Sequence, residues 1–304
     1  RHWHAQGGGL AMRAISTVVD TTVFLLLLGG AVATLVIGTG SVGAPPATGD
    51  PADETAQQLV TTTQSIEYVL RPTENESDGI DYDEATTDFG RSAHGTTAGL
   101  LAAAARASVT LNGQRLTPAS TGFTNRVRSE TRALVQRRDT AVAITVHWEP
   151  YTDAPIDGRL RVGPTPPARA DVRAATLTVD SGLEPTRERA LDIADENGTS
   201  GVARVVAASI VDGFFPPEET RVALRGDAPV DTLTAHRYRR VARLTDARLL
   251  DIGDASIRPM NDELTDALAQ RLATDMRSRF SSPQAAARAV RTGETEIVVR
   301  TWSP

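Results

Sequence analysis

The stretch RAISTVVDTTVFLLLLGGAVATLVI, from Arg13 to Ile37, decides how the rest of the chain is interpreted. Residues 15–37 are apolar apart from Asp20 and a few small polar residues. As a helix rising 1.5 Å per residue they would extend roughly 34 Å. The hydrocarbon core of a bilayer is about 30 Å thick. We therefore expect a transmembrane helix at 15–37, with membrane lipid as its partner.

Charged residues on either side of this stretch predict its orientation. Arg13 precedes it, acidic residues follow at 50–54, and the next basic residue is Arg71. Because basic residues favour the cytoplasmic side, we expect a cytoplasmic N-terminus and an extracellular C-terminal domain in the cell membrane. A cleaved secretory signal ending near 47–49 is the alternative, and it also places the remaining chain outside.

The residues Arg13-Ala14-Ile15-Ser16-Thr17-Val18-Val19 resemble the N-terminus of haloarchaeal type IV pilin-like proteins. In that family a basic and a small residue precede the prepilin-peptidase cut, and the apolar helix packs into a filament. The resemblance implies cleavage between Ala14 and Ile15, with pilin-like or secretion-machine proteins as partners. Asp20 stands one place after the family's usual glutamate, and Thr17 stands where proline is common. A minor pilin, or an anchored haloarchaeal protein of unknown function, fits this pattern better than a major pilin.

Composition narrows the class of protein. The chain has 304 residues, no Cys, 32 basic residues that are all Arg, and 38 acidic residues, so its net charge is −6. The absence of Cys excludes disulfides and thiolate metal sites. An acidic, Lys-free composition is typical of haloarchaeal proteins, although codon bias explains it equally well. The negative charge disfavours nucleic acid as a partner.

The chain divides into segments of different character. Residues 1–14 form an N-terminal extension with the pilin-type signal, 15–37 the transmembrane helix, and 38–54 a linker rich in Gly, Pro, Ala and Thr. Residues 55–304 form an extracellular domain, with a subdivision near residue 182 as an alternative to a single unit.

Hydrophobic periodicity predicts an α+β fold with a small antiparallel sheet and a mainly helical C-terminal half. Apolar residues alternate in the strands, and the strands at 141–149 and 170–180 are expected to pair, together with the C-terminal one. Asn112-Gly113 indicates a turn, and residues 150–168, with five Pro, are predicted to be a loop. The strands are predicted at 60–70, 141–149, 170–180 and 294–302, and the helices at 90–110, 122–138, 199–212, 217–224, 230–244, 261–280 and 283–291.

Few residues suggest chemistry. His147 and Glu149 share the less apolar face of a predicted strand and could act as an acid–base pair, but no third member accompanies them. The chain has no GxSxG, Walker, HExxH or Cys/His motif, so we expect no catalytic residue, no cofactor and no metal site. The acidic stretch 72–88 does not match the spacing of a helix–loop–helix calcium site, and a solvated loop is favoured. Asn75 and Asn197 begin glycosylation sequons.

The most basic segment lies at 230–244. It is a candidate site for an acidic polymer, a lipid headgroup or a partner protein. Pairing with neighbouring carboxylates is the favoured interpretation. The arginines are Arg237, Arg239, Arg240 and Arg243, and the carboxylates are those of Asp227, Asp231, Asp246 and Asp251.

These observations predict a non-enzymatic, membrane-anchored extracellular protein that serves as an accessory or minor pilin-like component of a haloarchaeal surface filament or secretion-type machine. Its role would be protein–protein interaction. A secreted or surface binding module without a filament role is the alternative, and a surface hydrolase is less favoured.

Overall fold

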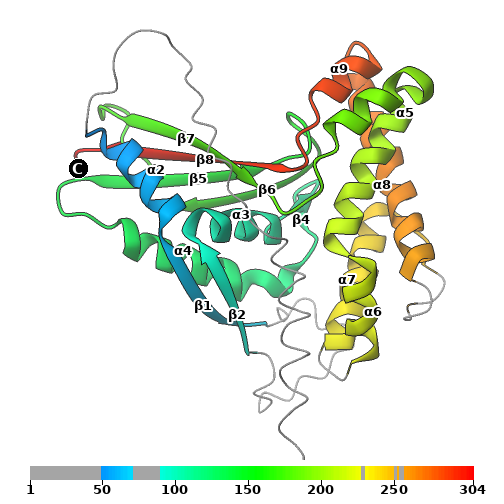
Figure 1. The fold of residues 1–304 in the computed structure, drawn as a ribbon, viewed down its shortest axis with the longest axis horizontal. Helices are drawn as coiled ribbons and strands as arrows, with labels where there is room; N and C mark the ends of the chain where they lie inside the picture. Colours follow the sequence, from blue (N-terminus) through cyan, green and yellow to red (C-terminus); the bar gives the residue numbers. More distant parts are fainter. Residues whose placement is uncertain (1–48, 71–89, 227–229, 250–251, 253–256) are drawn as a thin grey trace, which may run out of the picture.

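A six-stranded antiparallel sheet forms one half of the molecule, and five helices form the other (Figure 1). The computed structural model describes residues 49–70, 90–226, 230–249, 252 and 257–304. The strand order is β4-β3-β6-β5-β8-β7. The strands are β3 (Thr110–Leu111), β4 (Gln114–Arg115), β5 (Ala141–Trp148), β6 (Ile156–Val162), β7 (Arg173–Asp180) and β8 (Glu294–Trp302).

The C-terminal strand β8 occupies the space between β5 and β7. Ile297 lies opposite both Val146 of β5 and Leu177 of β7. The predicted strands at 141–149 and 170–180 therefore belong to one sheet, but they do not pair directly with each other. A chain terminus can complete a sheet in this way because antiparallel pairing needs no crossover helix.

Strand β6 lies inside the predicted loop at 150–168, and that prediction is wrong. Alternate residues of β6 are buried, from Ile156 through Leu160 to Val162. Gly158 interrupts the apolar alternation, and Arg159 occupies one of the outward positions. The prolines at 155 and 164 stand outside the strand, where the missing N–H costs no ladder hydrogen bond.

Helices cover one face of this sheet, and a second small sheet lies beyond them. The helices are α2 (Pro51–Thr61), α3 (Thr97–Ala107) and α4 (Thr121–Val135), which follows the short 3-10 turn Pro118–Ser120. Strands β1 (Thr63–Val69) and β2 (Gly90–Thr96) form an antiparallel hairpin. Because α3 contacts both β5–β6 and β2, it is the middle layer of a three-layer half (Figure 1).

The expected helix at 90–110 is half strand. Residues 90–96 pair with β1, and the helix begins only after Thr96, whose side chain accepts a hydrogen bond from Gly99 N at 3.1 Å. This contact is an N-cap, which satisfies a backbone donor of the first turn. The Ala-rich run that follows is buried on every side, as its position between two layers requires.

Five helices form the second half: α5 (Arg187–Phe214), α6 (Pro217–Arg225), α7 (Val230–Thr245), α8 (Ile257–Arg279) and α9 (Pro283–Arg288). The helix predicted at 261–280 is found, and its apolar residues Leu264, Leu268, Leu272 and Met276 are buried. Helix α5 contains a break at Gly198, which has φ 60°. Asn261 lies inside α8, which begins four residues earlier; it is buried and accepts a hydrogen bond from Tyr238 Oη at 2.7 Å.

The predicted fold class is wrong in its architecture. The central sheet is not small, and no helix in the part of the chain that the structure describes is long and apolar enough to cross a bilayer. The two longest helices, α5 and α8, carry charged residues such as Asp192, Arg204 and Arg271 along their length, so they are amphipathic helices of a folded domain. Residues 15–37, proposed as the transmembrane helix, lie outside the described residues. The predicted combination of helices with antiparallel strands is confirmed.

The two halves are joined at Thr292, which is fully buried. Its carbonyl oxygen accepts hydrogen bonds from Trp148 Nε1 at 2.9 Å and from Ser181 Oγ at 2.7 Å. Its hydroxyl donates to the Glu184 carbonyl at 2.8 Å and lies 3.0 Å from Thr186 Oγ1, which must then be the donor of that second contact. One residue thus ties the ends of β5 and β7 to the start of α5.

We expect Thr292→Val to lower the free energy of unfolding by roughly 1–3 kcal/mol, because it leaves the part-buried Glu184 carbonyl and the buried Thr186 hydroxyl with fewer partners. Thr292→Ser keeps the hydroxyl and should lose less. Urea denaturation of both variants checks this expectation. A larger loss for Thr292→Ser than for Thr292→Val would show that the methyl group, and not the hydroxyl, is the important part of Thr292.

Gly158 allows β6 to lie against α3. A Cβ atom at this position would come within 2.3 Å of the Ala105 carbonyl oxygen and 2.9 Å of Val109 Cγ2. Gly158→Ala should therefore destabilise the fold by about 1–3 kcal/mol or more, since backbone atoms cannot move aside easily. Gly95→Ala is the matched control, because its nearest neighbour would be Leu100 Cγ at 4.0 Å. Thermal unfolding with similar losses in both variants would contradict this account.

Candidate functional site

A group of charged side chains surrounds a buried carboxylate at one end of the sheet, on the face away from α3. We call His147, Glu149, Asp157, Arg159 and Arg291 the strand-end cluster. His147 lies opposite Arg159 on one side and Glu296 on the other. Because side chains alternate along a strand, Asp157 points to the same face as Arg159. Glu149 directly follows β5, and its Oε2 atom lies 3.6 Å from His147 Nε2.

Glu149 is the buried centre of the cluster and is 5% exposed. One carboxylate oxygen forms an ion pair with Arg291 Nη2, and the other accepts a hydrogen bond from Asp153 N at 3.0 Å. Arg291 follows α9, and its backbone N–H also donates to the Pro150 carbonyl at 2.8 Å. Oε1 of Glu149 therefore holds the end of β5 against the segment that leads from the helices into β8, and Oε2 fixes the turn that follows β5. Such a carboxylate is not available as a general base.

His147 stands between two carboxylates but bonds neither through Nε2. This atom is 3.6 Å from Glu149 Oε2 and 3.6 Å from Asp157 Oδ2, and it has no hydrogen-bond partner among the described residues. Asp157 is occupied by Arg159 Nε at 2.6 Å. Burial lowers the pKa of His147, and the Arg159 charge lowers it further, while Asp157 opposes the shift. The imidazole is consequently neutral at pH 7.

This arrangement supports a structural role for the pair that the sequence suggested. A general base must reach the proton that it removes, and a nucleophile activated by histidine must lie within about 3.2 Å of it. No described hydroxyl meets that condition at Nε2 of His147. The cluster joins strands and segments that are remote in sequence.

Beside the cluster, the same face of the sheet carries three arginines that point outward. Arg159 and Arg161 come from β6, and Arg300 comes from β8. The side chain of Arg159 is 68% exposed, Arg161 is exposed and Arg300 is half-buried. Arg161 Nη1 donates to Thr165 Oγ1 at 3.0 Å, and Arg300 Nη1 lies 3.4 Å from Thr145 Oγ1. We call Arg159, Arg161 and Arg300 the arginine face; within the described ranges, Arg161 and Arg300 form no salt bridge.

The residues singled out in the sequence do not meet at one site. Ala14 and Ile15 of the expected cleavage site, the Asn75 sequon and the acidic stretch 72–88 lie outside the described residues. Asn197 is exposed in α5, directly before the break at Gly198, and is not a member of the strand-end cluster. Its glycosylation stays a prediction.

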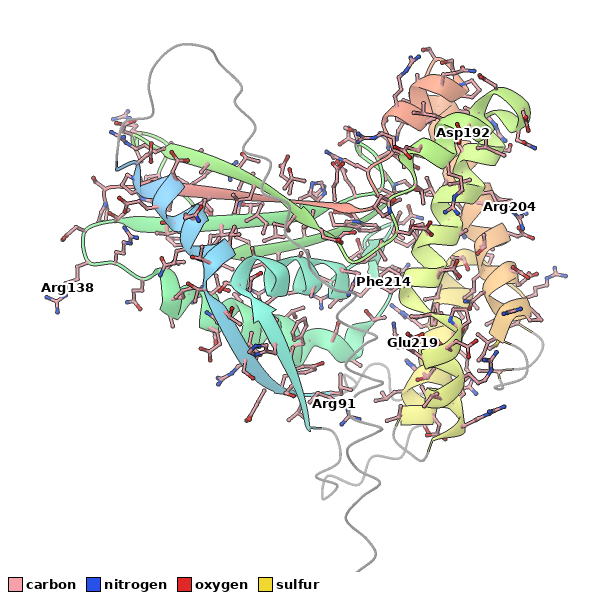
Figure 2. All side chains as sticks on the ribbon, viewed as in Figure 1. Arg91, Arg138, Asp192, Arg204, Phe214 and Glu219 are labelled. Atoms are coloured by element: carbon pink, nitrogen blue, oxygen red, sulfur yellow. The ribbon has the colours of Figure 1, made fainter. Side chains whose placement is uncertain are left out.

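The expected pairing of the α7 arginines with nearby aspartates is wrong where it can be seen. Arg237 Nη2 donates to the Phe214 carbonyl at 3.0 Å, and Arg240 Nε donates to the Arg115 carbonyl at 3.2 Å. Asp246 pairs instead with Arg271 of α8. Phe214 lies on the side of the helical half that faces the sheet (Figure 2) and is buried. Asp227 and Asp251 lie outside the described residues.

The sequence contained no local signal for the remaining members of the cluster. Arg291 is separated from Glu149 by most of the helical half, and Asp157 belongs to the strand that was predicted as a loop. The alternation of Ile156, Leu160 and Val162 was the one pattern that could have identified β6 and, with it, Asp157 and Arg159.

The lowered pKa of His147 makes the fold sensitive to acid. Because the unfolded histidine titrates near pH 6.5, the unfolded chain binds more protons just below that value, and stability falls as the pH drops toward the lower folded pKa. We expect His147→Gln to remove part of this loss between about pH 7 and about pH 5. His94→Gln, which changes an exposed residue of β2, should keep the wild-type profile. Melting temperatures across this range test the expectation, and parallel profiles for wild type and His147→Gln would contradict it.

Comparison with known proteins gives a family but no activity. The family model described as "Family of unknown function (DUF7284)" matches residues 19–302. No curated protein and no solved structure gives a match. The matched region includes every described element from α2 to β8 and most of the chain. The chain therefore belongs to DUF7284, a family of unknown function.

Proposed function

We propose that this protein is a non-enzymatic binding module whose arginine face contacts a partner protein. The observation that carries the proposal is the contrast between the two charged groups on one sheet face. The carboxylate of Glu149 is buried and used in joining the halves, whereas the guanidinium groups of Arg159 and Arg161 are exposed. Arginine is enriched in protein interfaces because its planar group makes several directed hydrogen bonds.

The arginines of the arginine face project from strands that are hydrogen-bonded into one sheet. Thr145 of β5 lies opposite Arg161 of β6 on one side and opposite Val298 of β8 on the other. An antiparallel sheet can leave one face to solvent while the other packs on a core, and here α2, α3 and α4 cover the opposite face. A binding surface on paired strands loses little conformational entropy when a partner docks.

The setting that we propose is extracellular. The resemblance of residues 13–19 to haloarchaeal pilin-like proteins favours an accessory or minor component of a surface filament or secretion-type machine. A surface or secreted binding module without a filament role is the second candidate, and the sheet face supports it equally. A surface hydrolase is less favoured, because both oxygens of Glu149 are engaged.

A photo-crosslinking amino acid at Thr176 tests this function, because Thr176 is exposed on β7 and shares the face with the arginines. In the cells that make the protein, we expect a covalent adduct of defined mass with one partner. The same group at Arg138 is the control: this residue projects from the loop before β5 at the far end of the sheet half (Figure 2). It should give no such adduct.

Charge reversal then asks whether the arginines carry the contact. Arg159→Glu together with Arg161→Glu should reduce the Thr176 adduct about tenfold, since like charges now face the acidic groups of the partner. Arg138→Glu should leave the yield unchanged. The proposal fails if the adduct forms equally at both crosslinking positions, or if its yield is the same with and without the arginines.

A further inference from the structure

A second basic surface lies on α7 and the segment after it. A groove of about 1020 Å³ is bordered by Arg239, Arg243 and Arg248. All three residues are exposed. Arg239 and Arg243 are four residues apart on one helix, so their side chains are neighbours. Within the described part of the chain no carboxylate forms a salt bridge with any of the three.

The floor of this groove is apolar. It is formed by Ala242 of α7 and by Ala247, Leu249 and Ile252 of the following segment. Ala242 is 6% exposed, and the other three pack against the core of the helical half. The groove therefore combines cationic edges with a hydrophobic base, which differs from the flat, polar arginine face of the sheet.

Two carboxylates of the described residues near the groove, those of Asp246 and Glu263, are already engaged. Asp246 lines the groove, but it forms an ion pair with Arg271 of α8. Glu263 Oε1 accepts a hydrogen bond from the backbone N–H of Arg248 at 3.2 Å, so it contacts the backbone of this residue and not its guanidinium group. Arg243 lies in the last turn of α7, where a cation also stabilises the helix end. That role does not explain Arg239 or Arg248, which lie outside this turn.

We propose that this groove binds an acidic segment of a partner protein, with carboxylates on Arg239, Arg243 and Arg248 and an apolar side chain on the floor. The inference rests on the proposed function as a binding module and adds a second surface with a stated partner chemistry. Guanidinium groups hold carboxylates through paired hydrogen bonds, and an apolar anchor supplies the part of the affinity that salt does not screen.

The shape and charge of the groove favour a peptide over other anions. A lipid surface is broad, and it attracts basic groups that project toward it, whereas these arginines border a concave groove. Nucleic acid binding depends on neutralising many phosphates along a backbone, and a chain of net charge −6 with three arginines here is poorly suited to it. A short peptide places acidic and apolar side chains at the spacing that such a groove offers.

The test uses the full chain and a short fluorescent peptide in which Glu and Leu alternate, with binding followed by anisotropy. Wild type should bind this peptide and should bind the corresponding Gln–Leu peptide at least tenfold more weakly. The double variant Arg239→Gln, Arg243→Gln should lose about tenfold in affinity, which is about 1.4 kcal/mol. Arg138→Gln, an exposed arginine of the sheet half, should bind as wild type does. Both altered helix residues are exposed, and unchanged melting temperatures would show that the fold is intact.

The inference is overturned if the double variant binds the Glu–Leu peptide as tightly as wild type does. It is also overturned if wild type binds vesicles containing anionic lipid but not the peptide. The crosslinking experiment at Thr176 reports separately on the sheet face. An adduct there without peptide binding would remove only the α7 groove, whereas peptide binding without the adduct would support the groove and reject the arginine face.

Discussion

The fold depends on the hydrogen bonds made by Thr292. Its carbonyl oxygen accepts hydrogen bonds from Trp148 Nε1 and Ser181 Oγ. Its hydroxyl forms hydrogen bonds with the Glu184 carbonyl and the Thr186 hydroxyl. These groups come from the ends of β5 and β7 and the start of α5, and Trp148, Ser181 and Thr186 are buried there. Because a buried polar group without a partner is costly, the chain is stable only when the three elements arrive together. The hydrophobic core of the sheet half and that of the helical half share this boundary.

Charged side chains are also buried at the boundary between the sheet half and the helical half. Arg106, at the end of α3, is 6% exposed and donates to the Ser181 carbonyl at 2.9 Å. Burial lowers its pKa to about 10, with Asp180 opposing that shift, so the guanidinium stays charged at neutral pH. Glu149 and Arg291 form the corresponding joint on the other face. The charges inside the joint are thus committed to structure, and the arginines left for a partner lie on the open sheet face and along α7.

Much of the secondary structure was predictable because it follows local periodicity. The alternation from Val142 to Trp148 identified β5, and the four-residue repeat from Leu264 to Met276 identified α8. Asn112-Gly113 identified the β3–β4 hairpin, where both residues have positive φ as a type I′ turn requires. Strand β6 was missed because the five prolines of 150–168 indicated a loop and because Gly158 interrupts the apolar alternation. The close approach of α3 that requires this glycine is a tertiary contact, which no local pattern reveals. His147 and Glu149, the two residues of the candidate site that the sequence analysis had paired, are only two residues apart, at the end of β5 and directly after it.

The sequence by itself determined which side chains could be buried and where helices and strands could run, because those properties repeat with the period of each element. It also determined the absence of thiol chemistry and the excess of carboxylates over arginines. Only the tertiary structure decided that β8 separates β5 from β7, that Arg291 engages Glu149, and that Arg237 and Arg240 bind carbonyl oxygens and not aspartates. These contacts join residues far apart in the chain, and their geometry exists only after the two halves have packed together.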